Sequence, residues 1–467
     1  MALKGTTMIE LTNVKTGEKE VYKDTNMVTN AMTDIFRKNL GGMLYCINGA
    51  PGDFYGTIVP FIKNGLGGIL LFSDPLEEDV DKYFAPSTNP CVGYASNDVN
   101  SGTNVKRGSL NLTESVEIEN GFKFVWDFTT SQANGTISAL ALTHKNAGRS
   151  YMGDTYDNPK VWYIKSSNAD CEINARNAYI HAVEADIENN FFWSIGLNTK
   201  NEIVIQKVRN SFTSVGVLDT MVGTRADILE EHILTPSVFV MSNPSSNTGT
   251  YDFMDGKDGY WYGIWHSANS SGDATFWWIK IDKGDFTFEE GKWTLKGVYA
   301  QSAGEQEYYD TDPRRYVNSV IRNGYLYLMS YDRQSVYKIN LENSVDVEQI
   351  KLGFTSNFSR SGGYDNRGGI CVYKFNDWIV YSDFMIDAAD EIHRTTNNMY
   401  FDQTQTELFQ YGPYMMGFGQ YYGRATRINL FLMLPYLATI NNLETSVIKT
   451  ADKTMKITYY ITEEPMV

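Results

Sequence analysis

The sequence predicts a mainly all-β protein, in which a degenerate β-propeller is inserted into a small β-rich terminal domain. Aromatic residues make up 14% of the 467-residue chain, which also has 39 glycines, and this composition is typical of pleated surfaces joined by many turns. A strand–turn–strand formula recurs through the middle of the chain. Both ends carry alternating apolar and polar residues. The length allows two or three domains.

The N-terminal segment predicts a hairpin followed by a helix. Residues 8–25, MIELTNVKTGEKEVYKDT, alternate apolar and polar side chains around a Thr-Gly pair, as a hairpin does. Residues 26–42, NMVTNAMTDIFRKNLGG, place apolar side chains at helical spacing. We expect one amphipathic helix here, capped by Asp24, Thr25 or Asn26 and ended by the Gly-Gly pair.

The remainder of the first domain, which we expect to span residues 1–120, has fewer regular signals. The stretch from Ile69 to Phe72 predicts a short buried strand, closed by an Asp-Pro turn. Residues 85–109 are rich in small polar side chains and predict a long loop.

Residues 121–400 carry the repeated formula. Asn323-Gly324 and Asp258-Gly259 each precede an aromatic strand, and such pairs supply the positive φ angles that tight hairpin turns need. Tyr163, Trp193, Tyr262, Tyr327 and Val380 occupy equivalent places in successive units, at irregular intervals. Since a propeller blade takes about 40–45 residues, this region predicts a propeller of about six blades. A β-sandwich with similar hairpins is the alternative.

The last segment, residues 401–467, leaves the repeat. Met455, Ile457, Tyr459 and Ile461 alternate with polar residues, which predicts a half-buried terminal strand. Such a strand needs a sheet to join, and the N-terminal hairpin is the natural candidate. We therefore expect the C-terminal strands to return to the domain that the N-terminus begins.

Charge and cysteine usage exclude several classes of protein. The net charge is −16 and the charges are scattered, which argues against a nucleic-acid partner. The four cysteines show no C-x-x-C spacing, so we expect neither a zinc site nor a redox motif, and folding in a reducing cytoplasm. The chain lacks a signal-peptide core, and its longest apolar run is too short to span a membrane.

Catalytic and metal motifs are absent from the sequence. None of the five histidines lies in a metal-binding motif, and neither a G-x-S-x-G elbow nor a phosphate-binding G-x-x-x-x-G-K-[ST] loop occurs. Asp252, Asp255 and Asp258 do not match the ligand spacing of an EF-hand loop, so a hairpin turn is the favoured interpretation over a Ca²⁺ site. We therefore expect no cofactor, no metal and no catalytic residues.

The segment 305–316, EQEYYDTDPRRY, holds the residue types of a sialidase site: arginines, a tyrosine with a glutamate, and aspartates. The Asp-box pattern of propeller sialidases is missing. An exposed loop is the favoured interpretation, and a glycan-cleaving enzyme is the alternative.

The aromatic surplus also suits sugar binding, because sugars stack on Trp and Tyr and bond to nearby polar groups. The candidate ligand-binding residues, all expected in loops or at strand ends, are Trp265, Tyr308, Tyr309, Asp312, Arg314, Arg315, Tyr331, Asp332, Arg333 and Tyr364.

Three segments resemble structural tail proteins of bacteriophages and of phage-tail-like bacteriocins of Gram-positive bacteria. They are GTTMIELTNVKTGEKEVYKDTNMVTNAMTDIF, GLGGILLFSDPLEED and ATINNLETSVIKTADKTMKITYYIT. The middle of the chain is similar only in its propeller-like character.

This resemblance implies a virion protein of the tail: a fibre, a baseplate-peripheral subunit or a receptor-binding protein, made in the bacterial cytoplasm. Such proteins assemble as homotrimers and attach to other tail or baseplate proteins through their terminal domains. The implied partners are thus other copies of the chain, neighbouring tail proteins and host cell-wall carbohydrate. A head or neck decoration protein is a further alternative.

Overall fold

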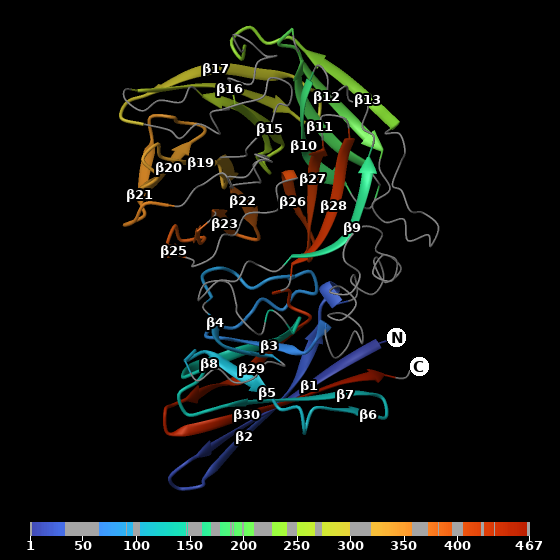
Figure 1. Cartoon of the computed structure of the whole chain (residues 1–467), viewed down its shortest axis with the longest axis vertical. Coiled ribbons are helices and arrows are strands. Elements are labelled where there is room, and N and C mark those ends of the chain that lie inside the picture. The colour runs from blue at the N-terminus through green and yellow to red at the C-terminus, as the bar shows by residue number, and fades with distance from the viewer. Residues whose placement is uncertain are drawn as a thin grey trace.

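The computed structural model describes residues 2–32, 65–89, 91–96, 103–145, 147, 161–169, 178–186, 189, 191–198, 200–209, 227–240, 250–266, 273–298, 319–356, 372–381, 383–394, 405–421, 425–433 and 435–464. Regular structure in these residues is almost entirely β, as the sequence predicts. It forms two parts, a barrel and a propeller-like ring of sheets (Figure 1).

The barrel is built from both ends of the chain. Its strands are β1 (Ala2–Asn13), β2 (Lys19–Val28), β3 (Gly68–Phe72), β4 (Cys91–Ser96), β5 (Arg107–Leu110), β6 (Val116–Ile118), β7 (Gly121–Phe128), β8 (Gly135–Thr143), β29 (Thr439–Lys449) and β30 (Lys453–Glu464). Their order is β30-β1-β2-β29-β8-β3-β4-β5-β7-β6, and β30 also pairs with β7. Nine strands therefore close a barrel, and β6 extends it from β7.

The N- and C-terminal strands lie side by side in this barrel, which confirms the expected pairing of the terminal strand with the N-terminal hairpin. The antiparallel register of β1 with β30 runs from Ala2 opposite Glu464 to Asn13 opposite Lys453. Both chain ends consequently lie on the same side of the barrel (Figure 1). The predicted alternation is confirmed too, since the apolar residues of β30 at 455, 457, 459 and 461 are each at most 1% exposed.

Two expectations for the first domain are not met. The structure extends β2 to Val28, so residues 24–26 lie in a strand and cannot cap a helix; helical backbone is described at residues 30–32, and the rest of the expected helix lies outside the described residues. The expected long loop contains β4 and the start of β5. Its small residues, such as Gly93 and Gly108, lie in strands that pack closely against side chains, where a larger residue would collide.

The ring consists of five four-stranded antiparallel sheets among the described residues. The first four follow one another in the chain: β10 (Ala178–Asp186), β11 (Phe191–Asn198), β12 (Ile203–Arg209), β13 (Asp227–Leu234); β14 (Thr250–Asp255), β15 (Tyr260–His266), β16 (Ala274–Asp282), β17 (Phe288–Leu295); β18 (Ser319–Arg322), β19 (Tyr325–Met329), β20 (Ser335–Asn340), β21 (Val347–Lys351); β22 (Val372–Phe375), β23 (Trp378–Tyr381), β24 (Phe384–Ile386), β25 (Ile392–Arg394). The fifth combines β26 (Gln405–Tyr411), β27 (Tyr414–Tyr421) and β28 (Ala425–Met433) with β9 (Val161–Ala169).

The first strand of each sheet lies at the centre of the ring. β10 contacts β14, β14 contacts β18, β18 contacts β22, β22 contacts β26, and β26 contacts β10. The ring is thus closed. β9, which comes first in the ring along the chain, pairs with β28, which comes last, and so completes the fifth sheet. A propeller-like arrangement follows from this topology.

The expected number of about six blades, taken from the length of the region, is not confirmed, since the described residues of the ring form five four-stranded sheets. One of the expected repeat positions is also wrong. Tyr163 resembles the start of a repeat, yet it lies on β9, the outer strand of the fifth sheet. The expected domain boundaries also differ from those observed. β7 and β8 belong to the barrel, so the ring begins at β9 rather than at residue 121. The ring also continues through β28, beyond residue 400.

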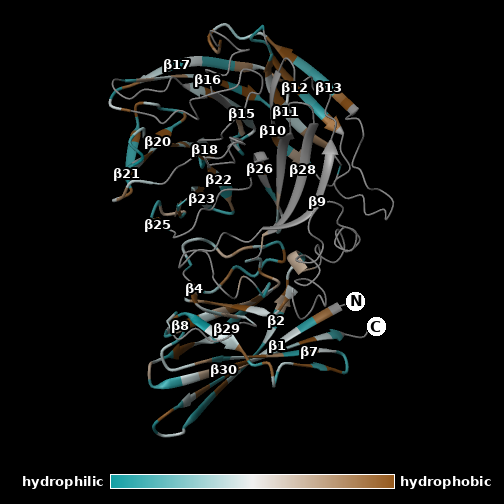
Figure 2. Ribbon diagram, viewed as in Figure 1, coloured by the Kyte–Doolittle hydropathy of each residue, from teal (hydrophilic) through white to brown (hydrophobic). Residues whose placement is uncertain are grey.

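The turn chemistry of the repeat is as expected at Asn323-Gly324, whereas before β15 the positive φ angles are at Lys257 (61°) and Gly259 (94°) rather than at Asp258 and Gly259. Asn323 and Gly324 have φ angles of 52° and 77°, and Asn376 has a φ of 53°. Both turns connect the first and second strands of a sheet, where a tight right-twisted hairpin requires positive φ. Hydrophobic and hydrophilic bands follow one another along β13, whose sequence is DILEEHIL (Figure 2).

The barrel and the ring share one hydrophobic core. Phe84 of the barrel meets Phe375 of β22, with ring centroids 4.6 Å apart in an edge-to-face arrangement. Tyr414 and Met415, at the start of β27, are buried in the same cluster as barrel residues such as Trp126. The ends of the fourth and fifth sheets near their first turns therefore pack directly on the barrel.

Candidate functional site

Where the structure describes them, the residues predicted to bind a ligand fall at two separate places, Trp265 on one strand and residues 331–333 together in one turn. Trp265 is on β15, and its ring stacks on Trp277 with centroids 3.7 Å apart, so it packs between strands of its own sheet. Tyr331 is exposed in the turn between β19 and β20. In that turn Asp332 accepts hydrogen bonds from Ser330 Oγ at 2.6 Å and from the Gln334 amide at 3.0 Å.

Arg333 belongs to the same turn, with a left-handed φ of 60°. The other predicted residues, Tyr308, Tyr309, Asp312, Arg314, Arg315 and Tyr364, lie outside the described residues, as does the whole segment 305–316.

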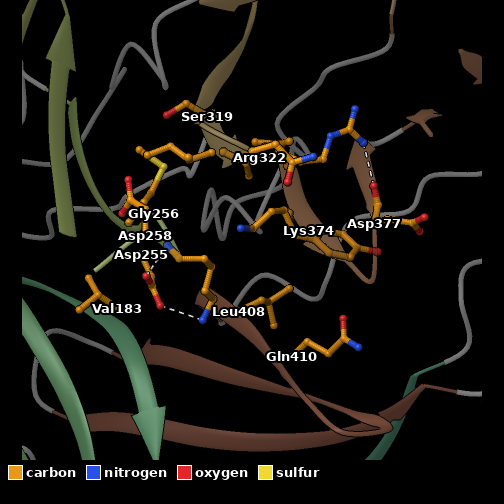
Figure 3. Close-up of a pocket in the computed structure, with 18 of the residues that line it drawn as sticks. Val183, Asp255, Gly256, Asp258, Ser319, Arg322, Lys374, Asp377, Leu408 and Gln410 are labelled. Carbon is orange, nitrogen blue, oxygen red and sulfur yellow. Dashed lines mark hydrogen bonds and ion pairs between the residues drawn. The ribbon is translucent and has the colours of Figure 1, made fainter. Parts of the chain in front are cut away.

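A cavity of about 760 Å³ lies at the centre of the ring, where residues of all five sheets converge (Figure 3). Its apolar wall comes from the first strands and includes Val183, Phe253, Val320, Val372 and Leu408. Turns between the first and second strands, at residues 256–258, 323–324 and 376–377, form its polar end. The cavity therefore has the apolar wall and the few converging polar groups that are typical of small-molecule sites.

Lys374 projects from β22 into this cavity (Figure 3). Its neighbours on the strand, Tyr373 and Phe375, are at most 3% exposed and face the sheet core, so the alternation of the strand directs Lys374 to the centre of the ring. Within the described part of the chain, its ammonium group has no hydrogen-bond or ion-pair partner. Burial and, to a smaller degree, the charge of Lys257 lower the pKa of Lys374 to about 8, against the attraction of Asp255.

Asp255, at the end of β14, is the centre of a second polar group at the cavity. Its carboxylate forms ion pairs with Lys257 Nζ at 2.7 Å and with Lys283 Nζ at 2.8 Å. Lys283 also pairs with Glu184 of β10 at 2.7 Å, which joins the first and second sheets. Burial would raise the pKa of Asp255, but the two lysines outweigh it and hold that pKa below the ordinary value.

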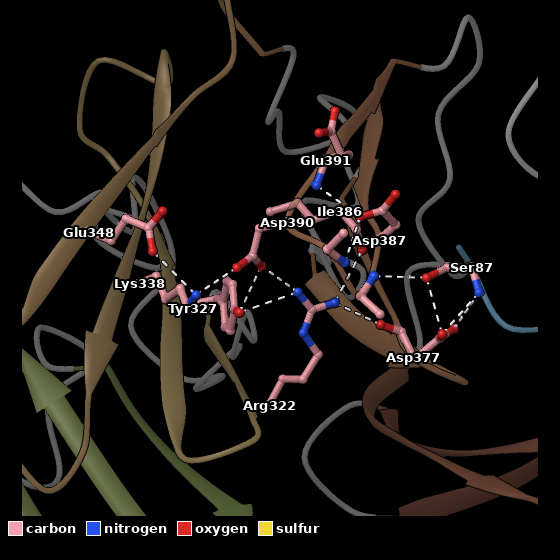
Figure 4. Close-up of polar contacts among 12 residues, drawn as sticks. Ser87, Arg322, Tyr327, Lys338, Glu348, Asp377, Ile386, Asp387, Asp390 and Glu391 are labelled. Carbon is pink, nitrogen blue, oxygen red and sulfur yellow. Dashed lines mark hydrogen bonds and ion pairs between the residues drawn. The ribbon is translucent and has the colours of Figure 1, made fainter. Parts of the chain in front are cut away.

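Arg322, at the end of β18, is the centre of a third group (Figure 4). Its guanidinium donates to the Asp377 carbonyl at 2.7 Å and forms an ion pair with Asp390 at 2.6 Å. Lys338 of β20 pairs with the other Asp390 oxygen at 2.6 Å, and the Tyr327 hydroxyl donates to Asp390 at 2.9 Å. The third and fourth sheets are thereby joined.

Asp377 completes the polar end and links it to the barrel. The backbone amide and the hydroxyl of Ser87 donate to one carboxylate oxygen of Asp377, at 2.9 and 3.1 Å. Ser87 Oγ in turn accepts from the amide of Ala388 at 2.8 Å. A barrel loop is therefore fixed to two turns of the fourth sheet (Figure 4).

Two carboxylates at the cavity are engaged within the protein. Asp255 and Asp377 are both held by internal donors, so neither carboxylate is placed as a free acid or base. Among the described residues, no group of three or more His, Cys, Asp or Glu side chains could hold a metal ion. A helix long and apolar enough to span a membrane is likewise not found in the part of the chain that the structure describes.

Sequence reasoning missed Lys374 and Arg322. The signal for Lys374 was its position in ICVYKF, the apolar first strand before the Asn376 turn, where a lone lysine at an inward position is unusual. Which side of that strand faces the ring centre follows only from the closure of five sheets, and that closure cannot be deduced from one repeat.

Comparison with known proteins gives no family. No family model matches the chain, and no curated protein matches it. Among solved structures, apo AztD from Citrobacter koseri is 10% identical, with a TM-score of 0.21, over 86% of this chain and 97% of that one.

Two further solved structures are similarly distant. A candidate exported protein from Bacteroides fragilis NCTC 9343 is 10% identical, with a TM-score of 0.22, over 72% of this chain and 93% of that one. A candidate 6-phosphogluconolactonase from Bacteroides uniformis ATCC 8492 is 8% identical, with a TM-score of 0.20, over 95% of this chain and 99% of that one. At these scores the likenesses carry no functional argument.

Proposed function

We propose that the protein is a structural component of a phage tail or a tail-like particle, in which the barrel attaches the subunit and the ring contacts a glycan on the host surface. The observation that supports this proposal best is the topology of the chain. β1 and β30 pair along their whole length, and the entire ring, β9 to β28, is inserted between β8 and β29. Such an insertion gives the chain one part that can attach to the particle, the barrel, and another that can face the host surface, the ring. A tail adhesin needs both.

The two faces of the ring differ in a way that fits this division. The turns between first and second strands, at Asn376-Asp377 and Gly412-Pro413, face the barrel side. The turn that holds Tyr331, Asp332 and Arg333 joins second and third strands, and so lies on the opposite face of the ring. We expect a host glycan to contact that opposite face, where Tyr331 is 44% exposed.

The assembly is part of the same proposal. The subunit is expected to form a homotrimer, to contact other tail or baseplate proteins through the barrel, and to reside in the virion. These partners come from the resemblance of the chain ends to tail proteins. The resemblance of segments 5–36, 65–79 and 438–462 falls on barrel elements, the part assigned to attachment.

Binding to cells tests the receptor role. Fluorescently labelled full-length protein should bind host cells and isolated wall polysaccharide, and Tyr331→Ala should weaken that binding at least several-fold. Val345→Ala is the matched control, because Val345 is 83% exposed in a turn on the other face of the ring. Absence of binding to either material would exclude the receptor role, and equal loss in both variants would exclude this surface.

Electron microscopy of the particle tests the location. Density for the subunit at the tail tip or baseplate, with the barrel toward the particle, is the expected result. Density on the capsid or neck would favour a decoration protein instead.

A glycan-cleaving tail enzyme is the second candidate, because residues 305–316 contain the residue types of a sialidase site. Release of soluble oligosaccharide from host wall material, abolished by Arg314→Ala and Arg315→Ala, would support it. Binding without any release would exclude it.

A further inference from the structure

We propose that the central cavity of the ring binds a small acidic sugar, whose carboxylate or phosphate group pairs with the ammonium of Lys374. This site is separate from the outer-face turn of Tyr331 and does not depend on the proposed function. It is defined by a cavity, by one charged side chain directed into it, and by the absence of a counter-charge for that side chain among the described residues.

The first step concerns the charges around Lys374. The cavity is lined by three cationic and four anionic side chains, which are Lys257, Arg322, Lys374, Asp255, Asp258, Glu342 and Asp377. Lys257 is paired with Asp255, and Arg322 with Asp390. Lys374 is half-buried, and no anion among the described residues pairs with it. Because an unpaired buried charge is costly, a retained one points to a partner that arrives from outside.

The second step excludes the nearby carboxylates as that partner. Asp255 already forms ion pairs with Lys257 and Lys283 and accepts a hydrogen bond from the Lys257 amide. Asp258 accepts the Tyr262 hydroxyl at 2.7 Å. Asp377 is turned toward Ser87. Each of these anions is thus engaged elsewhere, while Glu342 lies exposed at the rim.

The third step concerns the size and chemistry of the ligand. A cavity of about 760 Å³ lies within the range of sites that enclose drug-sized molecules, and it exceeds what a single inorganic ion requires. Its wall is apolar, and Asn323, Asn376 and Gln410 add neutral hydrogen-bonding groups. One cation that is unpaired among the described residues, an apolar wall and several amides together match a monosaccharide or disaccharide that carries one negative group.

Isothermal titration calorimetry on the full-length protein at pH 7 tests the proposal with three probes: glucuronate, glucose 6-phosphate and glucose. At least one of the two anionic sugars should bind, and neutral glucose should bind at least tenfold more weakly. The preferred anionic probe identifies carboxylate or phosphate as the recognised group. If neither anion binds, or if glucose binds equally well, the proposal is wrong.

Two variants assign the effect to Lys374. Lys374→Met should weaken anion binding at least tenfold, whereas Lys351→Met, which removes an exposed lysine from β21, should leave it unchanged. Lys374→Met removes an unpaired charge, so it should fold at least as stably as the wild type, and weak binding cannot then be ascribed to unfolding. Unchanged binding by Lys374→Met would overturn the assignment.

Proton uptake gives an independent readout. An anion beside Lys374 would raise its pKa, so binding near pH 8 should take up protons, measured as a dependence of the binding enthalpy on the ionisation enthalpy of the buffer. Asp255, Lys257 and Arg322 are the charged groups that act on Lys374. Anion binding without proton uptake would place the anion elsewhere.

Discussion

The Arg322 guanidinium and the Asp390 carboxylate meet at 2.6 Å across the boundary between the third and fourth sheets. Arg322 ends the innermost strand β18 and is only 8% exposed, while Asp390 lies in the turn after β24. Lys338 and the Tyr327 hydroxyl converge on the same carboxylate. One aspartate therefore neutralises two cations that the packing of the two sheets brings together.

We predict that Asp390→Asn strongly destabilises the ring. The substitution keeps the size of the side chain but leaves Arg322 without its anion and Lys338 with only the exposed Glu348, and an uncompensated buried charge costs about 3–5 kcal/mol. Because Asp390 is partly exposed, we expect a loss near the lower end of this range in the free energy of unfolding, measured by urea denaturation. Glu348→Gln is the control: Glu348 pairs with Lys338 at 3.2 Å but its side chain is 60% exposed, so the loss should stay within about 1 kcal/mol.

The Asp390 carboxylate also makes the free energy of unfolding fall at acid pH, which gives the stability curve an acid limb. Burial would raise the pKa of Asp390, but the hydrogen bonds from Lys338 and Tyr327 and the charges of Lys338 and Arg322 hold that pKa below the ordinary aspartate value of 3.8. The folded pKa lies below the unfolded one, so this contribution is complete above about pH 4 and is lost as the pH falls through the folded pKa. Asp390→Asn should flatten that part of the stability curve, and an unchanged acid limb would contradict the assignment.

We predict that Asp377→Ala weakens the junction of barrel and ring. The substitution removes the acceptor for the Ser87 amide and hydroxyl, and hydrogen bonds to a charged group contribute about 1.5–3 kcal/mol. We expect a loss of about 2 kcal/mol and an unfolding transition that broadens or splits in calorimetry, since the two parts lose a polar anchor. Ser87→Ala, which removes only the hydroxyl, should cost about half as much. Equal stability of Asp377→Ala and wild type would show that the other contacts of the junction, such as Phe84–Phe375, hold it without this anchor.

The barrel could be predicted further from the sequence than the ring could. The alternation in residues 455–461 indicates one buried face, and a lone terminal strand must find a partner, so the pairing of both chain ends follows from local pattern plus elementary hydrogen bonding. The extent of that barrel was not predictable. Strands β7 and β8 resemble the hairpins of the ring, and only long-range pairing assigns them to the barrel.

In the ring, the turns could be predicted from the sequence but the closure could not. Its hairpin turns are encoded locally by residues that tolerate positive φ, such as Asn323 and Asn376. Its closure is not local, because β9 joins β28 only after the whole ring has been traversed, and a strand that looks like a new repeat ends the last one. The central site shares this dependence. Its residues Lys374, Arg322 and Asp255 come from different sheets. They lie near one another only because the five sheets close into a ring.

We predict that Trp265 contributes to stability rather than to ligand binding. Its ring stacks on Trp277 and packs against the core between the first two sheets, so Trp265→Ala should cost about 3 kcal/mol in the free energy of unfolding. Trp265→Phe, which keeps an aromatic face over Trp277, should recover part of that loss. Binding of the folded Trp265→Ala variant to host cells should match wild type at temperatures well below its Tm. A selective loss of binding at unchanged stability would restore Trp265 as a ligand contact.

We predict that Lys374→Met stabilises the protein without ligand at pH 7 and that this gain disappears in alkali. Burial lowers the pKa of Lys374 from the ordinary lysine value of 10.5 to about 8, so below pH 8 the folded state holds a charge that the unfolded state solvates better. The corresponding penalty is at most on the order of 3 kcal/mol, and partial exposure of the side chain reduces it. Above pH 8 the folded protein releases the proton first, so the penalty decreases as the pH rises and vanishes above about 10.5.

Urea denaturation of wild type and Lys374→Met from pH 6 to pH 10 measures this difference directly. The gap between the two should be widest near pH 7 and should narrow steadily above pH 8. Lys351→Met removes an exposed lysine and should follow the wild type throughout, which separates the local effect from the change in net charge. A variant less stable than wild type at pH 7 would mean that Lys374 already has a stabilising partner in the folded chain, and the central cavity would then lack the unpaired cation on which anion binding depends.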